Sequence, residues 1–256
     1  MKQSKELKLA IKAAKAAGKI LMKNFRSGVS AKNKSLHELV TPVDVESEKA
    51  IVSMLEKEFP DYGILAEESA SKEKKSDSTW IIDPIDGTHN YFFGLPMFAV
   101  SIALQKRDKI QCGVIFLPAL NELYYAERGK GAFMNGKRIS VSKRPMEKAV
   151  VAISARIVAS PKRLDFFKEF YPKIFSSRNF GSACFALANL AAGNIDAAIN
   201  FNNKPWDFAA GWLLVEEAGG ILTAFGGTPA SLSNGAYIAS SGVFHEFLAR
   251  ETEGLK

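Results

Sequence analysis

Two hydrophobic periodicities alternate along this chain of 256 residues. Apolar residues recur every three or four positions in some segments, which predicts amphipathic helices. These segments are residues 2–25, 45–59, 161–170, 182–192, 206–218 and 243–250. Short apolar runs between turn-forming residues predict strands at 62–66, 80–83, 98–105, 110–117, 122–126, 132–134, 149–154, 174–176, 195–201, 221–224 and 236–239. Because helices and strands alternate around a central antiparallel run, we expect an α/β or α+β layered sandwich.

The stretch WIIDPIDGTHN, residues 80–90, contains the strongest candidate chemistry. Three apolar residues predict a buried strand that stops at Asp83, and Pro84 biases Asp83 toward an extended conformation. Asp86 follows three residues later in a turn. The segment therefore offers two carboxylates at a strand end, and carboxylates are ligands for hard cations such as Mg²⁺.

The next residues of the same stretch suit an anion. Gly87 removes a side chain where the backbone would approach a ligand closely, and Thr88 is an expected N-cap of a short helix through Phe92. Free N–H groups at a helix N-terminus hold phosphate, so a metal site beside a phosphate site suggests metal-assisted phosphoryl chemistry. The same residue types also form ordinary turns, which is the alternative for this segment alone.

Composition narrows the kind of metal. The chain has two cysteines and three histidines, and they are scattered without zinc-ligand spacing. Any metal is therefore expected to be held by oxygen ligands, which favours Mg²⁺ or Mn²⁺. The chain has no apolar run long enough to cross a membrane and no signal-peptide pattern, so we expect a soluble, cytoplasmic protein.

The formal net charge is +7, and much of it lies in the first predicted helix. Its lysines recur every three or four residues beside a stripe of mostly small apolar residues; they are Lys2, Lys5, Lys8, Lys12, Lys15, Lys19 and Lys23. One interpretation is a helix that binds nucleic acid or a membrane surface. We favour a helix that docks by its apolar face with its lysines in water, so no membrane or nucleic-acid partner is expected.

Five acids share a position at the edge of an apolar element: Asp44, Glu67, Asp83, Asp86 and Asp207. If they meet in one cleft they repel one another, and their pKa values rise unless cations neutralise them. Convergence would therefore imply metal. The alternatives are that Asp207 stabilises a helix dipole and that the Glu67–Glu68 pair is solvated loop charge.

At these residues the chain resembles the inositol monophosphatase family of Mg²⁺-dependent, lithium-sensitive phosphatases. The segments VTPVDVESE around Asp44, GILAEES around Glu67, WIIDPIDGTHNY and KPWDFAAGWLLVEEAGG are similar to its signatures, and GSACFALANLAAGNID resembles the helix and strand before the last one. The resemblance spans almost the whole chain. It implies an α-β-α-β-α layered sandwich, a phosphomonoesterase and a homodimer.

The resemblance also implies the metal ligands. Glu67, Asp83 and the carbonyl of Ile85 would bind one Mg²⁺, and Asp83, Asp86 and Asp207 would bind a second, with a third weaker ion near Glu67. Within one catalytic domain, residues 1–256, we expect two lobes that meet near residues 142–148. Residues 1–145 would form the metal and phosphate lobe, and residues 146–256 would carry Asp207.

Catalytic and substrate-binding roles follow from the same resemblance. Asp44, Glu67 and Thr88 would be catalytic, with Thr88 and Asp44 orienting and deprotonating the attacking water. The expected substrate-binding residues are Asp86, Gly87, Thr88, Asn200 and Asp207.

Two positions depart from the family pattern. Asn200 stands where inositol-specific members commonly have a glutamate, and Ala66 replaces a glycine before the two glutamates. An amide still hydrogen-bonds a diol but brings no charge. Inositol-1-phosphate therefore stays the first candidate substrate. Fructose-1,6-bisphosphate, 3′-phosphoadenosine 5′-phosphate, NADP and histidinol phosphate are the alternatives within the fold, and a nucleic-acid-binding module is the alternative of another class.

Overall fold

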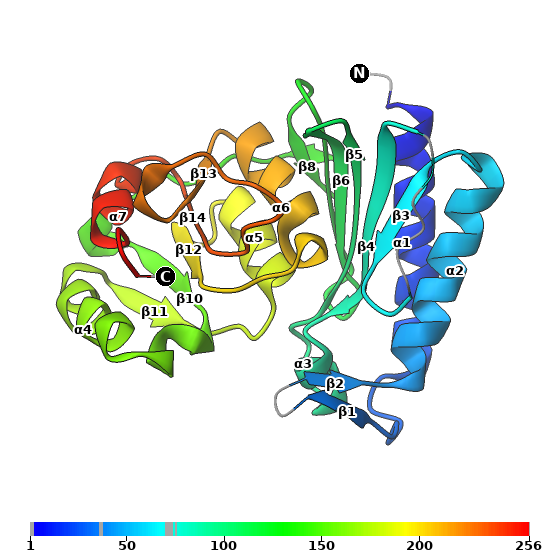
Figure 1. Ribbon diagram of the computed structural model, residues 1–256, viewed down its shortest axis with the longest axis horizontal. Coiled ribbons are helices and arrows are strands. Elements are labelled where there is room, and N and C mark those ends of the chain that lie inside the picture. Colours follow the sequence, from blue (N-terminus) through cyan, green and yellow to red (C-terminus); the bar gives the residue numbers. More distant parts are fainter. Residues whose placement is uncertain (1–2, 36–37, 70–73, 75, 256) are drawn as a thin grey trace.

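The computed structural model describes residues 3–35, 38–69, 74 and 76–255. Lys2 of the lysine stripe, His37 and part of the predicted loop at 69–78 lie outside the described residues. The elements form five layers: two helices, a sheet, two helices, a second sheet and two helices (Figure 1). This arrangement confirms the predicted layered sandwich.

The larger sheet contains seven strands in the described part of the chain, in the order β3-β4-β5-β6-β7-β8-β9. Strand β3 runs parallel to β4, and every later neighbour pair is antiparallel, as the predicted meander requires. The strands are β3 (Gly63–Ala66), β4 (Ser78–Asp86), β5 (Ala99–Lys106), β6 (Lys109–Leu117), β7 (Glu122–Glu127), β8 (Ala132–Met134) and β9 (Lys137–Arg138).

Both faces of this sheet are buried, which explains its continuous apolar runs. In β5, Val100, Ile102 and Leu104 pack toward helices α1 and α2, whereas Ala99 and Ala103 belong to the core that contains α5 and α6. The outer helices are α1 (Lys5–Asn24) and α2 (Pro42–Glu58), and the central helices are α5 (Ala183–Ala191) and α6 (Pro205–Glu217).

Helix α6 lies directly on the sheet because one strand residue has no side chain. A Cβ at Gly113 of β6 would lie 2.9 Å from the Cα of Ala210 in α6, too close for any other residue. This contact fixes the height of α6 above the sheet and so helps to position Asp207 in its first turn.

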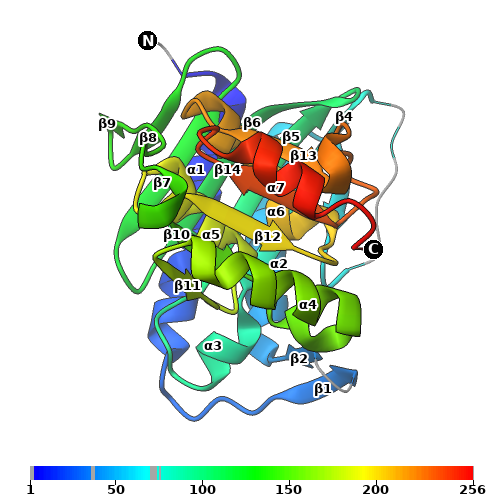
Figure 2. The same cartoon turned by 90° about the vertical axis from the view of Figure 1, so that its left-hand side faces the viewer.

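The smaller sheet has the order β11-β10-β12-β14-β13 in the described residues. Its far face is covered by α4 and α7, which stand in front of it in Figure 2. The strands are β10 (Val150–Ile153), β11 (Ser176–Arg178), β12 (Ala197–Asn200), β13 (Ile221–Ala224) and β14 (Tyr237–Ser240); the helices are α4 (Pro161–Phe170) and α7 (His245–Glu251). Four 3₁₀ turns join these elements: η1 (Met146–Lys148), η2 (Ala155–Ala159), η3 (Tyr171–Lys173) and η4 (Phe225–Gly227).

A small hairpin and a short helix lie together at one end of the molecule (Figure 1). The hairpin consists of β1 (Lys32–Ser35) and β2 (Glu38–Val40), and the helix is α3 (Thr88–Phe92). The predicted seam at 142–148 is the segment between β9 and β10, where the chain passes from the larger to the smaller sheet. The two-lobe division itself stays a prediction.

Several predicted boundaries were wrong by a few residues. Helix α2 begins at Pro42 rather than at residue 45, because Thr41 caps it and proline suits the first helical position. Strand β4 continues to Asp86 through an irregularity in its pairing instead of stopping at Asp83. The strand predicted at 174–176 lies at Ser176–Arg178, and the short strand β9 was missed.

Candidate active site

A cleft of about 870 Å³ lies where the two halves of the chain face each other. The end of β4 and the start of α3 line one side, and β10, η2, the start of α5 and the start of α6 line the other. Of the predicted site residues, all but Asp44 line this cleft: Glu67, Asp83, Ile85, Asp86, Gly87, Thr88, Asn200 and Asp207.

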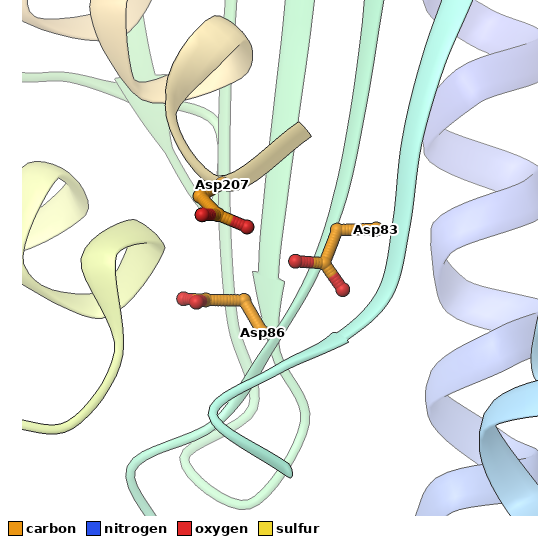
Figure 3. Close-up of side chains that lie close together, drawn as sticks. All are labelled: Asp83, Asp86 and Asp207. Atoms are coloured by element: carbon orange, nitrogen blue, oxygen red, sulfur yellow. The ribbon is translucent and has the colours of Figure 1, made fainter. Parts of the chain in front are cut away.

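Three carboxylates converge at the floor of the cleft. Asp83 and Asp86 come from β4, and Asp207 comes from the first turn of α6 on the opposite side (Figure 3). One oxygen from each lies within 4.8 Å of the others. Asp83 and Asp86 are buried and Asp207 is half-buried, so the group combines shielding from water with access from the cleft.

Asp86 is fixed by the N-terminus of α5. Its Oδ2 accepts hydrogen bonds from the Ser182 hydroxyl and from the Cys184 N–H, the latter at 2.7 Å, and its Oδ1 accepts from the Ala183 N–H at 3.3 Å. Ser182 also caps α5 through its hydroxyl. The start of α5, a helix packed between the two sheets, thus holds Asp86 of the larger sheet. These hydrogen bonds fix the position of Asp86 relative to α5.

Backbone N–H groups orient the other two acids. The Oδ1 of Asp83 accepts from the N–H of Ile85 at 2.9 Å, and the Oδ2 of Asp207 accepts from the N–H of Lys204 at 2.7 Å. Asp207 is therefore the third residue of α6 bonded back to its N-cap, as the helix-start alternative expected, and it also lines the cleft.

Burial and mutual repulsion raise the pKa values of all three acids. Burial is the largest cause in each case. The pKa of Asp86 rises to about 6 even though three donors favour its charged form, and the pKa of Asp207 rises to about 8 with Asp86 as its main repulsive neighbour. The pKa of Asp83 rises well above its ordinary value because Glu67, Asp86 and Asp207 add their charges to its burial. An all-oxygen cluster that resists charging fits a divalent hard cation.

Glu67 joins the cluster on the side of Asp83, to which it hydrogen-bonds. Its Oε1 also pairs with the ammonium of Lys34 from the β1–β2 hairpin at 3.1 Å, and the same ammonium contacts Glu68. Asp83 therefore contacts Glu67 and also belongs to the group of three aspartates. Its bridging role stays a prediction.

Asp44 lies behind Thr88 rather than at the cleft surface. It is fully buried as the third residue of α2, where its Oδ2 accepts from the N–H of Thr41 at 2.8 Å and from the Thr41 hydroxyl at 2.6 Å. The Thr88 hydroxyl lies 3.3 Å from Asp44 Oδ1 and 2.9 Å from the carbonyl of Ile85. Burial raises the pKa of Asp44. The predicted Asp44–Thr88 pair is thus brought together.

The N-cap of α3 is Gly87, not Thr88 as the sequence suggested. Its φ of 89° lies in the left-handed region, and an added Cβ would lie 3.0 Å from the Met97 carbonyl oxygen and 3.1 Å from Ser182 Cβ. Glycine is therefore required for both its conformation and its close packing.

Asn200 ends β12 at the opposite wall of the cleft and is nearly buried. Its Nδ2 donates to the hydroxyl of the buried Tyr237 at 2.9 Å, which fixes the orientation of the amide. Asn200 therefore lies across the cleft from Asp83 and Asp86 of β4. Its predicted contact with a leaving group stays a prediction.

Sequence reasoning missed two residues that organise the site. Lys34 stands in a polar stretch without any motif, so nothing in the sequence signals its pairing with Glu67. Ser182 has a recognisable signal, since a serine directly before an apolar helical run is a common N-cap, but its bond to Asp86 joins residues 96 positions apart.

A layered sandwich with clustered carboxylates in a cleft is the arrangement of a class of metal-dependent hydrolases. Comparison with known proteins gives the same class. The family model of the inositol monophosphatase family matches residues 2–256. A Thermotoga maritima protein named fructose-1,6-bisphosphatase/inositol-1-monophosphatase is 38% identical over 94% of this chain and 93% of its own length. The Nus factor SuhB of Escherichia coli is 37% identical over 92% of this chain and 91% of its own length.

Solved structures are similar over the same extent. The extragenic suppressor protein suhB of Bartonella henselae superposes with a TM-score of 0.94 at 35% identity, covering 98% of this chain and 99% of that one. The inositol monophosphatase of Anabaena gives 0.85 at 32% identity, covering 96% and 94%.

The chain belongs to the inositol monophosphatase family and is a phosphatase of that metal-dependent family. The resemblance read from its motifs is confirmed. Among the described residues, no helix is both long and apolar enough to span a membrane.

Proposed function

We propose that this protein hydrolyses phosphate monoesters of small polyols or sugars with Mg²⁺ as its cofactor, and that inositol-1-phosphate is the first candidate substrate. The observation that carries the proposal is the cluster of Asp83, Asp86 and Asp207, whose oxygens lie within 4.8 Å of one another without a basic side chain paired to them in the described residues. Such a cluster needs a cation from outside the chain.

The ligand sets proposed from the sequence fit this geometry. Glu67, Asp83 and the Ile85 carbonyl would hold one ion, and Asp83, Asp86 and Asp207 a second, with a third beside Glu67. Mn²⁺ would substitute, since it accepts the same oxygen ligands. When bound, two such cations neutralise phosphate charge and activate water.

The chain itself supplies orientation and a proton acceptor. Gly87 and Thr88 line the cleft at the first turn of α3, where their N–H groups would bind phosphate oxygens. The Thr88 hydroxyl would accept a hydrogen bond from the attacking water while it donates to Asp44. Because Asp44 is buried and its pKa is raised, it is a better proton acceptor than an exposed aspartate.

The identity of the alcohol would depend on the wall opposite Asp83 and Asp86. Asn200 would contact the leaving group there, with an amide in place of the charged residue common in inositol-specific members. Fructose-1,6-bisphosphate is the second candidate, since a relative at 38% identity carries both activities in its name. The remaining candidate substrates are 3′-phosphoadenosine 5′-phosphate, NADP and histidinol phosphate.

The test is phosphate release from these five compounds by purified protein with Mg²⁺, with EDTA and with lithium. We expect release from at least one compound, loss of release with EDTA, and inhibition by lithium. Absence of release from every compound, with the protein folded and Mg²⁺ or Mn²⁺ present, contradicts the proposal.

We also propose a cytoplasmic homodimer. Phe92, Phe93 and Leu95 form an exposed apolar group at the end of α3, and such groups commonly mark contacts between chains. Sedimentation analysis of wild type and Phe93→Ser measures the mass directly. A wild-type monomer at micromolar concentration contradicts the dimer.

A second candidate function uses the lysines of α1. Lys5, Lys8, Lys12, Lys15, Lys19 and Lys23 are all exposed, and the described residues give none of them an ion pair. Phosphate backbones bind such faces with steep salt dependence. Binding to a generic RNA that weakens at high salt and disappears in a variant with Lys8, Lys12 and Lys15 changed to Gln would support it; no binding at low salt excludes it.

A further inference from the structure

Asn200 has a buried partner that does not itself line the cleft. Strands β12 and β14 are antiparallel and Asn200 pairs directly with Tyr237, so the two side chains project from the same face of the smaller sheet. On this face Tyr237 belongs to the core that contains α5 and α6, whereas the neighbouring pair, Ile199 and Ile238, belongs to the core on the far face. The register of the sheet therefore places a tyrosine directly behind the wall of the cleft.

The side chain of Tyr237 is held in place by packing. Tyr237 is fully buried, and its ring stacks on that of Phe208 with the ring centres 5.1 Å apart. Phe208 follows Asp207 in the first turn of α6, so the tyrosine packs against the helix start that carries a cleft aspartate. Burial raises the pKa of Tyr237 well above its ordinary value, and its hydroxyl therefore stays neutral near neutral pH.

The hydroxyl of Tyr237 engages one end of the Asn200 amide. Asn200 Nδ2 donates to this hydroxyl at 2.9 Å, which leaves the acceptor Oδ1 for another partner. In the described part of the chain no hydrogen bond reaches Oδ1, and this oxygen is not one of the fully buried polar atoms without a partner. Oδ1 is therefore accessible, and the space that Asn200 lines is the cleft.

The chain between β12 and α6 is anchored to the same part of the molecule. The N–H of Asn203 donates to the Gly235 carbonyl at 3.0 Å, and Asn203 Nδ2 lies 3.5 Å from the Tyr237 hydroxyl. A Cβ at Gly235 would lie 1.8 Å from the Asn203 carbonyl oxygen, so only glycine allows this approach. The segment from Gly235 to Tyr237 therefore fixes the backbone from which Asn200 and Asn203 line the cleft.

An amide oxygen held in one orientation selects among leaving groups. It accepts a hydrogen bond from an alcohol hydroxyl, whereas a phosphate or carboxylate is itself an acceptor and gains nothing from it. A site that bonds a substrate hydroxyl discriminates strongly against analogues that lack the hydroxyl. A tyrosine that orients the amide in advance strengthens this discrimination, because the amide then loses less conformational freedom when the substrate binds.

We propose that Tyr237 is a positioning residue for substrate selection: its hydroxyl holds the Asn200 amide so that Oδ1 accepts a hydrogen bond from a hydroxyl group of the leaving alcohol. The favoured leaving group is therefore an uncharged alcohol that carries a free hydroxyl near the ester oxygen. The inference rests on the proposed phosphatase activity and on the predicted contact of Asn200 with the leaving group. It adds a residue that acts through Asn200 and does not line the cleft.

The test compares two matched substrate pairs with Mg²⁺: inositol-1-phosphate with cyclohexyl phosphate, and glycerol 2-phosphate with isopropyl phosphate. In each pair the carbon skeleton is the same, and only the first compound carries free hydroxyls. Wild type should favour the hydroxylated compound in kcat/KM by about tenfold or more for at least one pair. Tyr237→Phe removes one oxygen and keeps the ring, and it should lower that ratio by about fivefold, the scale of one hydrogen bond. The fall should come mainly from a higher KM for the hydroxylated compound.

The matched control is Tyr124→Phe. Tyr124 of β7 is also fully buried and its hydroxyl donates to Glu122 at 2.7 Å, but it does not line the cleft. Both variants lose one hydrogen-bonded hydroxyl of a buried tyrosine, and only Tyr237→Phe should change the ratio. Far-ultraviolet circular dichroism and thermal melts establish that each variant is folded.

A double variant separates positioning from a general effect on structure. Asn200→Ala should lower the same ratio, since it removes the amide. Tyr237→Phe added to Asn200→Ala should lower the ratio little further, because the hydroxyl acts through that amide. Loss of structure alone would lower the ratio in both backgrounds.

The outcomes distinguish this role from the phosphatase activity itself. If wild type hydrolyses both members of each pair at similar kcat/KM, or neither hydroxylated compound, the preferred leaving group is wrong. Phosphate release from the five candidate substrates then decides separately on phosphatase activity. If Tyr237→Phe and Tyr124→Phe change the ratio equally, or Tyr237→Phe acts as strongly in Asn200→Ala as in wild type, phosphatase activity stands and the positioning role of Tyr237 is wrong.

Discussion

Two kinds of carboxylate in this protein, Asp196 and the three cleft aspartates, have opposite electrostatic surroundings. Asp196, directly before β12, is fully buried and accepts from the Arg144 guanidinium at 2.9 and 3.1 Å and from the Val150 N–H at 2.7 Å. The Ser142 hydroxyl bonds to the same carboxylate. The chain therefore supplies the counter-charge and the donors that Asp196 needs.

The cleft aspartates lack such a counter-charge. Asp83, Asp86 and Asp207 accept from backbone N–H groups and one hydroxyl, but no basic side chain pairs with them in the described residues. A buried carboxylate with its own cation contributes to structure, whereas several without one form a site for a cation from solution. The partners of a carboxylate, and not its burial, thus distinguish a structural acid from an acid that binds a ligand.

The largest expected effect is the loss of activity when a cleft aspartate is changed. Asp86→Asn should reduce phosphate release by more than about a hundredfold, since even indirect contacts to a metal ligand cost 10- to 100-fold. The fold should change little, because the asparagine oxygen can still accept from Cys184 and Ser182 while a buried charge is removed. Initial rates measure the loss of phosphate release, and calorimetry with Mg²⁺ measures the metal affinity of the variant.

Asp165→Asn is the matched control, because Asp165 is an exposed acid of α4 outside the cleft. It should match wild type in rate and Mg²⁺ affinity. Unchanged Mg²⁺ affinity and unchanged rate in Asp86→Asn would remove Asp86 from the site.

Mg²⁺ should stabilise the folded protein through the same acids. At a concentration about 100 times its Kd, a ligand of the native state adds about 2.7 kcal/mol, which corresponds to a Tm rise of about 5–10 °C for a chain of this size. Differential scanning calorimetry with Mg²⁺ and with EDTA measures the shift. An equal shift in wild type and Asp86→Asn would show that Mg²⁺ acts elsewhere.

Asp196→Asn should affect stability instead of chemistry. Loss of its charged hydrogen bonds should cost about 2 kcal/mol, discounted because Arg144 is partly exposed and can be hydrated. The expected Tm fall is about 4–8 °C. Specific activity per folded molecule should be unchanged at a temperature well below the Tm. A fall in activity without a fall in Tm would reverse the assignment of the two carboxylate sets.

A neutral polar residue beside the cleft gives a smaller effect. Asn200→Glu should raise the preference for inositol-1-phosphate over fructose-1,6-bisphosphate by about 1 kcal/mol, roughly fivefold, the scale of one hydrogen bond. The glutamate can still accept from the Tyr237 hydroxyl that Asn200 contacts. The ratio of kcat/KM values for the two substrates is the measurement. A ratio that does not move in a folded, active variant places Asn200 away from the leaving group.

His245 extends the comparison to a buried base and should give the smallest effect. Its ring nitrogens contact Ser240 at 2.8 Å and Thr223 at 3.0 Å, and burial lowers its pKa from 6.5. The unfolded chain therefore binds a proton first as pH falls below about 6.5, so native stability declines toward acid pH. His245→Gln has no titrating ring at this position, so it lacks this contribution to the fall in stability. Thermal melts from pH 8 to pH 5 should show a shallower decline for His245→Gln, and parallel declines contradict the assignment.

The motifs predicted the chemistry of the site because they are local. The segment from Asp83 to Thr88 places two carboxylates and a glycine turn within six residues, and the short range of backbone geometry fixes their order. The layered sandwich was also predictable, since alternating helical and strand periods leave few ways to bury every apolar face.

Other features depend on contacts between distant parts of the chain. Ser182 and Asp86 are 96 positions apart, and only the packing of α5 against the larger sheet brings them together. The pairing of Lys34 with Glu67 likewise has no local signal. The sequence by itself determined which acids are present and which backbone turn holds them. Tertiary structure decided which acids lack a counter-charge and which cations lie near them. The reason is that the charges around a cleft come from elements far apart in the sequence, which only folding brings together.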